Sequence, residues 1–175
     1  MIRAVIAAMW SVVFGLAGQG ALVEVAVDVA PASVVTVEGE QIKLSPQAPR
    51  VWAEGTKLRR LQTIAPGVGT PAPGAIVPGS VVVRHDGRVL TAGKDYLADP
   101  VWGSLGIGPD PSVTTDDVGT VDYRYSLRRL DSRIQTADGE TILRQGKPHL
   151  TVPQPPALQA GETRLANLFV DYHSD

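Results

Sequence analysis

Histidine and serine are the residues of this sequence that could act as bases or nucleophiles. The three histidines, His85, His149 and His173, lie far apart, and no His-x-x-x-His spacing of the kind that binds zinc occurs. Hydrolytic serines occur in short blocks such as Gly-x-Ser-x-Gly or Gly-Asp-Ser, whereas Ser132 follows a Leu-Asp pair. The sequence therefore nominates no catalytic residue, no metal ligand and no cofactor site.

Carboxylates gather in one acidic stretch that could hold calcium through hard oxygen ligands. It contains Asp110, Asp116 and Asp117, with Asp122 shortly after them. The D-x-D-x-D-G spacing and the closing glutamate of an EF-hand loop are both missing. We therefore interpret this stretch as a solvated loop.

Basic residues gather in two short stretches of the chain. These are Lys57, Arg59 and Arg60 in the first, and Arg124, Arg128, Arg129 and Arg133 in the second. Guanidinium groups bind carboxylate or sulfate through paired hydrogen bonds, although on strands such residues usually mark the solvated face. We retain Arg124 and Arg128 as candidate contacts to an anionic ligand.

Aromatic side chains could form a platform on which a sugar ring stacks. The candidates are Trp52, Tyr96, Trp102, Tyr123 and Tyr125. Because the chain has only 3 Trp, 4 Tyr and 2 Phe, most of these rings are needed in the core. Trp102 lies in a turn-rich segment after Asp99-Pro100, and it is the aromatic residue that we retain as a candidate for ligand binding.

Composition excludes several classes of protein. A net charge of −2 over 175 residues argues against a nucleic-acid-binding protein driven by phosphate contacts. The absence of cysteine excludes disulfides and thiolate metal sites. With 18 Gly and 14 Pro, the chain favours short strands and many turns over helices.

Residues 1–21 have the pattern of a secretory signal peptide. Arg3 precedes an uncharged apolar run over residues 4–17, and the small residues Gly18, Gly20 and Ala21 follow. We expect a helix that is cleaved from an exported protein, which would be periplasmic, extracellular or at the cell surface. An uncleaved anchor is the alternative, and contact with a membrane is expected through this segment alone.

Residues 22–63 predict the first strands. The alternation over residues 22–29 is typical of a half-buried strand. Residues 34–37 and 41–44 flank a Glu-Gly-Glu turn and predict a hairpin, because Gly39 can adopt a positive φ angle. Residues 51–61 predict two short strands around Gly55. Alternating proline and glycine over residues 64–80 then predict a linker or crossover loop.

The second half of the chain carries the clearest hairpin signals. Asp86-Gly87 is a strong two-residue turn signal, and Asp99-Pro100 opens a further turn. A strand over residues 121–125 should place Val121, Tyr123 and Tyr125 on one core-facing side. Residues 127–136 and 141–143 predict another hairpin, and residues 165–172 a last strand. The sequence ends soon after this strand, so we expect a fragment of a longer protein.

Together these signals predict an all-β, mostly antiparallel β-sandwich built from hairpins, after an N-terminal signal helix. The predicted units are the signal peptide over 1–21, N-terminal strands over 22–63, a linker or crossover loop over 64–80, and a main sandwich unit over 81–175. The first strands alone would bury too little surface to stand independently. We therefore expect residues 22–63 to complete the sheets of the main unit.

Several segments together resemble a known family. They are PGSVVVR at 78–84, GKDYLADPVWGSLG at 93–106, VDYRYSLRRLDS at 121–132, KPH at 147–149 and GETRLANLFVDY at 161–172. This arrangement resembles the N-terminal β-rich region that precedes the catalytic domain in some bacterial secreted SGNH/GDSL-type hydrolases. The resemblance covers about residues 77–172.

In that family a Gly-Asp-Ser block supplies the nucleophile, and a late Asp-x-x-His block supplies the rest of the triad. This chain has neither block, since Asp171-Tyr172-His173 is one residue too short for the second. The resemblance therefore implies a non-catalytic accessory module of an exported esterase that acts on acylated sugars or similar esters. Its partner would be a C-terminal catalytic domain that this chain lacks, and it would also present carbohydrate.

Two alternatives come from different functional classes. The first is a structural or adhesive β-sandwich of the cell surface or of a phage-like assembly, which joins copies of itself through exposed strand edges. The second is an autonomous esterase, which the missing nucleophile disfavours.

Overall fold

The computed structural model describes residues 10–12, 25–27, 29–49, 54–61 and 72–173 of the chain. In these ranges the secondary structure consists of twelve strands and one short 3₁₀ turn, and the named strands pair antiparallel within four sheets. The predicted all-β, mostly antiparallel fold is therefore confirmed. The described residues contain no helix long and apolar enough to cross a membrane.

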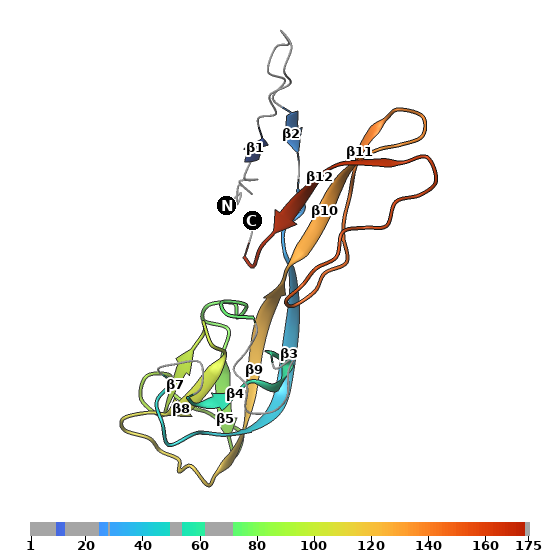
Figure 1. Cartoon of the computed structure of the whole chain (residues 1–175). Helices are drawn as coiled ribbons and strands as arrows, with labels where there is room; N and C mark the ends of the chain where they lie inside the picture. Colours follow the sequence, from blue (N-terminus) through green and yellow to red (C-terminus); the bar gives the residue numbers. More distant parts are fainter. Residues whose placement is uncertain (1–9, 13–24, 28, 50–53, 62–71, 174–175) are drawn as a thin grey trace, which may run out of the picture.

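The largest sheet lies at one end of the elongated molecule and has the strand order β3-β9-β5-β6 (Figure 1). Its strands are β3 (Ser33–Lys43), β9 (Val118–Leu127), β5 (Val82–His85) and β6 (Arg88–Val89). Asp86 and Gly87 join β5 to β6 with φ angles of 49° and 74°. Positive φ at both positions is what a two-residue type I′ turn requires, so the predicted Asp-Gly hairpin is confirmed.

A second sheet has the order β4-β8-β7. Its strands are β4 (Thr56–Lys57), β8 (Ser104–Ile107) and β7 (Tyr96–Asp99). The turn predicted at Asp99-Pro100 joins β7 to β8. Of the two strands predicted around Gly55, the second is the two-residue β4, which leads into the 3₁₀ turn η1 (Arg59–Leu61). The first falls mainly on residues 50–53, which lie outside the described residues.

These two sheets share one hydrophobic core and form a small sandwich. Val121 and Tyr123 of β9 are 0% and 1% exposed, and Tyr125 packs against the same core, so the predicted core-facing side of β9 is confirmed. The core draws on residues before and after the Pro/Gly-rich segment. Its buried members are Ile42, Leu44, Leu58, Leu61, Ala72, Ala75, Ile76, Val83, Leu90, Tyr96, Leu105, Val113, Val121, Tyr123 and Leu150.

A third sheet lies at the other end of the molecule, where β9 continues almost directly into β10 (Arg129–Gln135) (Figure 1). Its order is β11-β10-β12, with β11 (Thr141–Arg144) and β12 (Thr163–Val170). The hairpin and the last strand predicted for this part of the chain are confirmed. Between Arg164 and Ala166, β12 accommodates one extra residue relative to β10, which makes a β-bulge.

Two short strands near the N-terminus, β1 (Trp10–Val12) and β2 (Val25–Val27), pair with each other antiparallel. The strand predicted over residues 22–29 is present at Val25–Val27. The signal helix predicted over residues 1–21 lies outside the described residues except for Trp10–Val12, which are extended rather than helical.

Strand β3 shows that the hairpin predicted over residues 34–44 is wrong. Both halves of that segment pair with β9, because Val37 lies opposite Tyr123 and Glu40 opposite Val121. Three steps along β3 therefore match two along β9, and the extra residue forms a bulge at Gly39, whose φ angle is 65°. Glycine with positive φ serves bulges as well as turns, and the local sequence does not distinguish the two.

The Gly-Lys-Asp-Tyr motif before β7 is organised by the carboxylate of Asp95. It accepts hydrogen bonds from the backbone N–H groups of Thr91 at 2.7 Å and Ser112 at 2.8 Å. The hydrogen bond from Thr91 has the largest effect, and together with those from Ser112 it lowers the pKa of Asp95 to about 2. The carboxylate thus fastens the loop after β8 to the start of β7.

We expect Asp95→Asn to lower the melting temperature by several degrees at pH 7, because an amide cannot accept two such bonds equally well. The pKa in the folded chain lies below the unfolded value of about 3.9. The stabilisation is therefore present above about pH 4 and is lost as the pH falls toward 2. Melting curves across that range should show a weaker pH dependence for Asp95→Asn than for Asp86→Asn, a control in an exposed turn. An equal pH dependence of the melting temperature in both variants would contradict a stabilising role for the Asp95 carboxylate.

Candidate functional site

The junction between β9 and β10 brings together charged, aromatic and hydroxyl side chains from distant parts of the chain. Residues 126–132 form one side of it, and the end of β12 with the residues that follow forms the other. Ser126, Arg128 and Ser132 each contact this C-terminal segment through their side chains. The junction is therefore where the candidate site is built.

Arg128, Phe169, Asp171 and Tyr172 form what we call the Arg128 cluster. The Arg128 Nε donates a hydrogen bond to Asp171 Oδ1 at 2.7 Å. Its guanidinium carbon lies 4.1 Å from the ring centre of Tyr172 and 5.7 Å from that of Phe169, within range of cation–π attraction. Phe169 is 56% exposed. The cluster thus offers solvent an apolar ring beside a cation and a carboxylate.

The two charges of the Arg128 cluster stabilise each other. Burial of Asp171 opposes its ionisation, but the hydrogen bonds from Arg128 and from the Tyr172 backbone outweigh that effect and lower its pKa. Burial raises the pKa of Tyr172, whose hydroxyl donates to the Leu150 carbonyl. At neutral pH the cluster therefore holds one cation, one anion and a neutral phenol.

Ser126 and His173 form a hydroxyl–imidazole pair that the sequence does not predict. The Ser126 hydroxyl lies 3.0 Å from His173 Nδ1, and His173 Nε2 lies 2.9 Å from the Gly74 carbonyl oxygen. A carbonyl only accepts, so Nε2 carries a proton, and in a neutral imidazole Nδ1 then accepts from the serine. Ser126 is 1% exposed, so this pair fastens the C-terminus and does not present a nucleophile to solvent. The two residues are 47 positions apart, with no local signal that connects them.

Arg129 and Asp131 form a buried ion pair at the same junction. Two guanidinium nitrogens donate to the Asp131 carboxylate at 2.6 and 2.9 Å, and the side chains are 4% and 0% exposed. Arg129 also donates to the Ala30 and Pro31 carbonyls, and Asp131 accepts from Gly146 at 2.9 Å. Basic residues on strands usually lie on the solvated face, but Arg129 is buried.

The three predicted ligand-binding residues do not make one site. Arg124 is exposed on β9, and it is four residues from Arg128, which corresponds to about 13 Å along an extended strand. Trp102 is partly buried in the turn between β7 and β8, where its backbone N–H donates to Asp99 at 3.0 Å. Of the three, only Arg128 belongs to a cluster of side chains that could together contact a ligand.

Three of the four aspartates considered for calcium have separate partners. Asp110 lies 3.5 Å from Lys94, Asp117 accepts from Thr114, and Asp122 pairs with Arg84. In the part of the chain that the structure describes, no three histidine or acidic side chains are grouped so that they could hold a metal ion.

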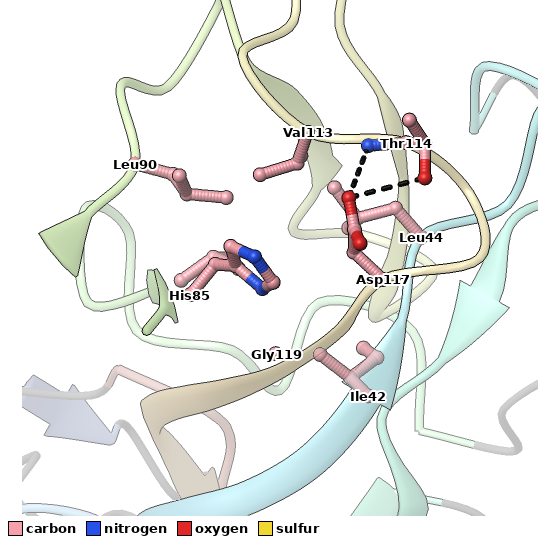
Figure 2. A pocket seen from close by; sticks show the side chains of 9 residues that line it. Ile42, Leu44, His85, Leu90, Val113, Thr114, Asp117 and Gly119 are labelled. Carbon is pink, nitrogen blue, oxygen red and sulfur yellow. Dashed lines mark hydrogen bonds between the residues drawn. The ribbon is translucent and has the colours of Figure 1, made fainter. Parts of the chain in front are cut away.

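A pocket of about 230 Å³, partly open to solvent, lies beside His85 (Figure 2). Much of this volume is open solvent, and the hollow itself has room for about one water molecule. Its polar groups are already engaged, since His85 Nδ1 lies 3.2 Å from the Val118 carbonyl. Hydrogen bonds from Thr114 lower the pKa of Asp117 and hold that carboxylate in place. The lining residues are Ile42, Leu44, Val83, His85, Leu90, Val113, Thr114, Asp117 and Gly119.

Comparisons of the chain with protein-family models, with curated proteins and with solved structures gave no match.

The buried pair at the junction leads to a stability prediction. Asp131→Ala would leave Arg129 buried without its counter-ion, which typically costs about 3–5 kcal/mol of unfolding free energy. The double variant Arg129→Met with Asp131→Leu should cost less than the two single variants added together. Lys94→Met, which removes an exposed pair, should cost less than about 1 kcal/mol. Urea unfolding measures all five variants, and a loss below 1 kcal/mol for Asp131→Ala would exclude this role.

Proposed function

We propose that this chain is a non-catalytic assembly module that joins another polypeptide by strand addition at β12. In the described structure β12 pairs with β10 on one side and has no strand along its other edge. A free edge presents unpaired backbone N–H and C=O groups, which can accept a further strand. The single observation that carries the proposal is the composition of this edge.

Apart from its bulge at Leu165, strand β12 lacks the features that normally protect an edge. It is eight residues long, and from Leu165 to Val170 it contains no charged residue and no proline. Leu165 and Phe169 are 48% and 56% exposed on its solvent side. Natural sheets usually place lysine, proline or a very short strand at such a position. An uncovered apolar edge of this kind favours a binding surface.

The other edge strands of the described sheets provide the comparison. Strands β4 and β6 have two residues each, β1 and β2 have three, and β7 and β11 have four. Strand β3 is longer and has one bulge, as β12 does, but it carries exposed charges at Glu38 and Lys43. Each of these seven strands is either at most four residues long or carries exposed charges, whereas β12 is eight residues long and uncharged from Leu165 to Val170. The contrast supports a specific role for that edge.

This proposal develops the structural or adhesive interpretation of the sequence. It keeps the expectation that residues 1–21 direct export, so that the module would act outside the cytoplasm. A second candidate is the accessory module of an exported SGNH/GDSL-type esterase, which would pack on a C-terminal catalytic domain and bind carbohydrate. The exposed ring of Phe169, with a guanidinium and a carboxylate beside it, is the observation that favours this candidate.

Strand addition is tested with a fluorescein-labelled peptide of residues 162–172 and a scrambled peptide of the same composition. We expect the chain to raise the fluorescence anisotropy of the first peptide saturably, and that of the scrambled peptide at least tenfold more weakly. Leu165→Lys with Phe169→Lys should abolish binding, because charges on an edge oppose pairing. Val89→Lys, at a 57% exposed position of β6, is the matched control. Equal binding by both variants would exclude β12 as the docking edge.

Carbohydrate binding is tested by calorimetry with acetylated xylo-oligosaccharides. Phe169→Ala should weaken binding about tenfold, equivalent to about 1.4 kcal/mol, because the exposed ring supplies the stacking surface. Val152→Ala, at a 64% exposed position outside the Arg128 cluster, should leave the affinity unchanged. If no heat of binding is measured for the natural chain, this second candidate is wrong.

A further inference from the structure

The exposed residues of β12 are arranged symmetrically about Asn167, and this arrangement indicates which strand the edge accepts. Its side chains alternate between exposed and partly buried along the strand, and the alternation continues through the bulge. From Asn167 outward in either direction, the next exposed residue is apolar, Leu165 on one side and Phe169 on the other. The segment is therefore similar when read from either end.

We propose that the strand added at β12 is β12 of a second copy of this chain, paired antiparallel about a two-fold axis at Asn167. This inference rests on the proposed function, since it names the partner of the same edge. In this register Leu165 lies opposite Phe169 of the second copy, and Asn167 lies opposite its own counterpart. Apolar side chains then meet apolar ones, and the two amides can exchange a hydrogen bond.

Neighbouring registers match less well. A two-fold axis perpendicular to the sheet keeps the exposed sides of both copies on the same face. Moving this axis by one residue along β12 shifts the pairing of the two strands by two residues. An axis at Ala166 would place Leu165 opposite Asn167, and an axis at Leu168 would place Phe169 opposite Asn167. Both put an apolar side chain opposite an amide. The axis at Asn167 is the one that matches polar with polar and apolar with apolar.

Charge is also compatible with this pairing. Arg164 would lie opposite Val170 of the second copy, and Thr163 opposite Asp171. Like charges directly opposite each other destabilise a strand pair, and this register contains none. Arg164 is already held by its own chain, since its Nε donates to the Ser132 hydroxyl at 3.1 Å. The paired copies would form one continuous sheet in the order β11-β10-β12-β12-β10-β11, and its interface symmetry would be that of most homodimers.

The absence of cysteine makes a disulfide test specific. Directly opposite residues have Cα atoms about 4.5–5.5 Å apart, within the range that a disulfide spans. Under mild oxidation of the full chain, Asn167→Cys should therefore give a cross-linked dimer. Leu165→Cys alone and Phe169→Cys alone should not, because equivalent residues would lie about 13 Å apart. An equimolar mixture of those two variants should cross-link, whereas Val89→Cys should stay monomeric.

The outcomes separate this inference from the proposed function. Asn167 accepts a hydrogen bond from Ser132 at 2.8 Å, so circular dichroism must show that Asn167→Cys is folded, and the mixed pair tests the register independently. Failure of both cross-links in folded protein overturns the two-fold pairing, and so does faster cross-linking of Leu165→Cys alone. If the peptide of residues 162–172 still binds in that case, the edge accepts strands, but not in the two-fold register at Asn167. If the peptide fails as well, the proposed function is also wrong.

Discussion

The backbone ladder along β9 is the interaction on which the rest of the structure depends. Strand β9 pairs with β3 along nearly its whole length and with β5 on its other side. It then continues into β10, the central strand of the third sheet. One continuous run of extended backbone therefore organises both ends of the molecule. Its side chains alternate, so Val121 and Tyr123 fill the sandwich core while Arg124 remains exposed.

Polar side chains reinforce this ladder where apolar packing cannot. Tyr123 is 1% exposed, yet its hydroxyl donates to Glu40 at 2.8 Å and accepts from the Arg60 backbone at 3.3 Å. Burial and the neighbouring Glu40 carboxylate raise the pKa of Tyr123, so the phenol stays neutral. Glu40 also accepts from the Arg59 backbone at 2.7 Å. A core tyrosine thus connects β9 to β3 and to the 3₁₀ turn, and its hydroxyl is satisfied in the process.

The sequence predicts those features of the fold that depend only on residues close together in the chain. The Asp86-Gly87 hairpin and the core-facing side of β9 follow from turn chemistry and period-two alternation. The hairpin predicted around Gly39 is wrong, because whether a glycine makes a turn or a bulge depends on the partner strand. The candidate site could not be predicted from the sequence for a similar reason, since it also depends on contacts between distant segments. Arg128 could be nominated from its charge, but its contacts with Phe169 and Tyr172 join segments about 40 residues apart. The alternation that exposes Leu165 and Phe169 is present in the sequence, yet only the sheet order shows that this strand is an edge.

The two ends of the molecule differ in how much apolar surface they bury, and this difference bears on assembly. Among the residues whose burial the structure describes, the sandwich end has a core of fifteen buried hydrophobic residues, whereas the buried hydrophobic residues outside that core are Ile134 of β10 and Val170 of β12. A three-stranded sheet with so little apolar burial is marginal by itself. Here the Arg129–Asp131 pair and the continuity with β9 hold it in place. A strand added at β12 would cover Leu165 and Phe169 and would stabilise this end in proportion to the occupancy of the edge. Assembly and completion of the fold would then be the same physical event.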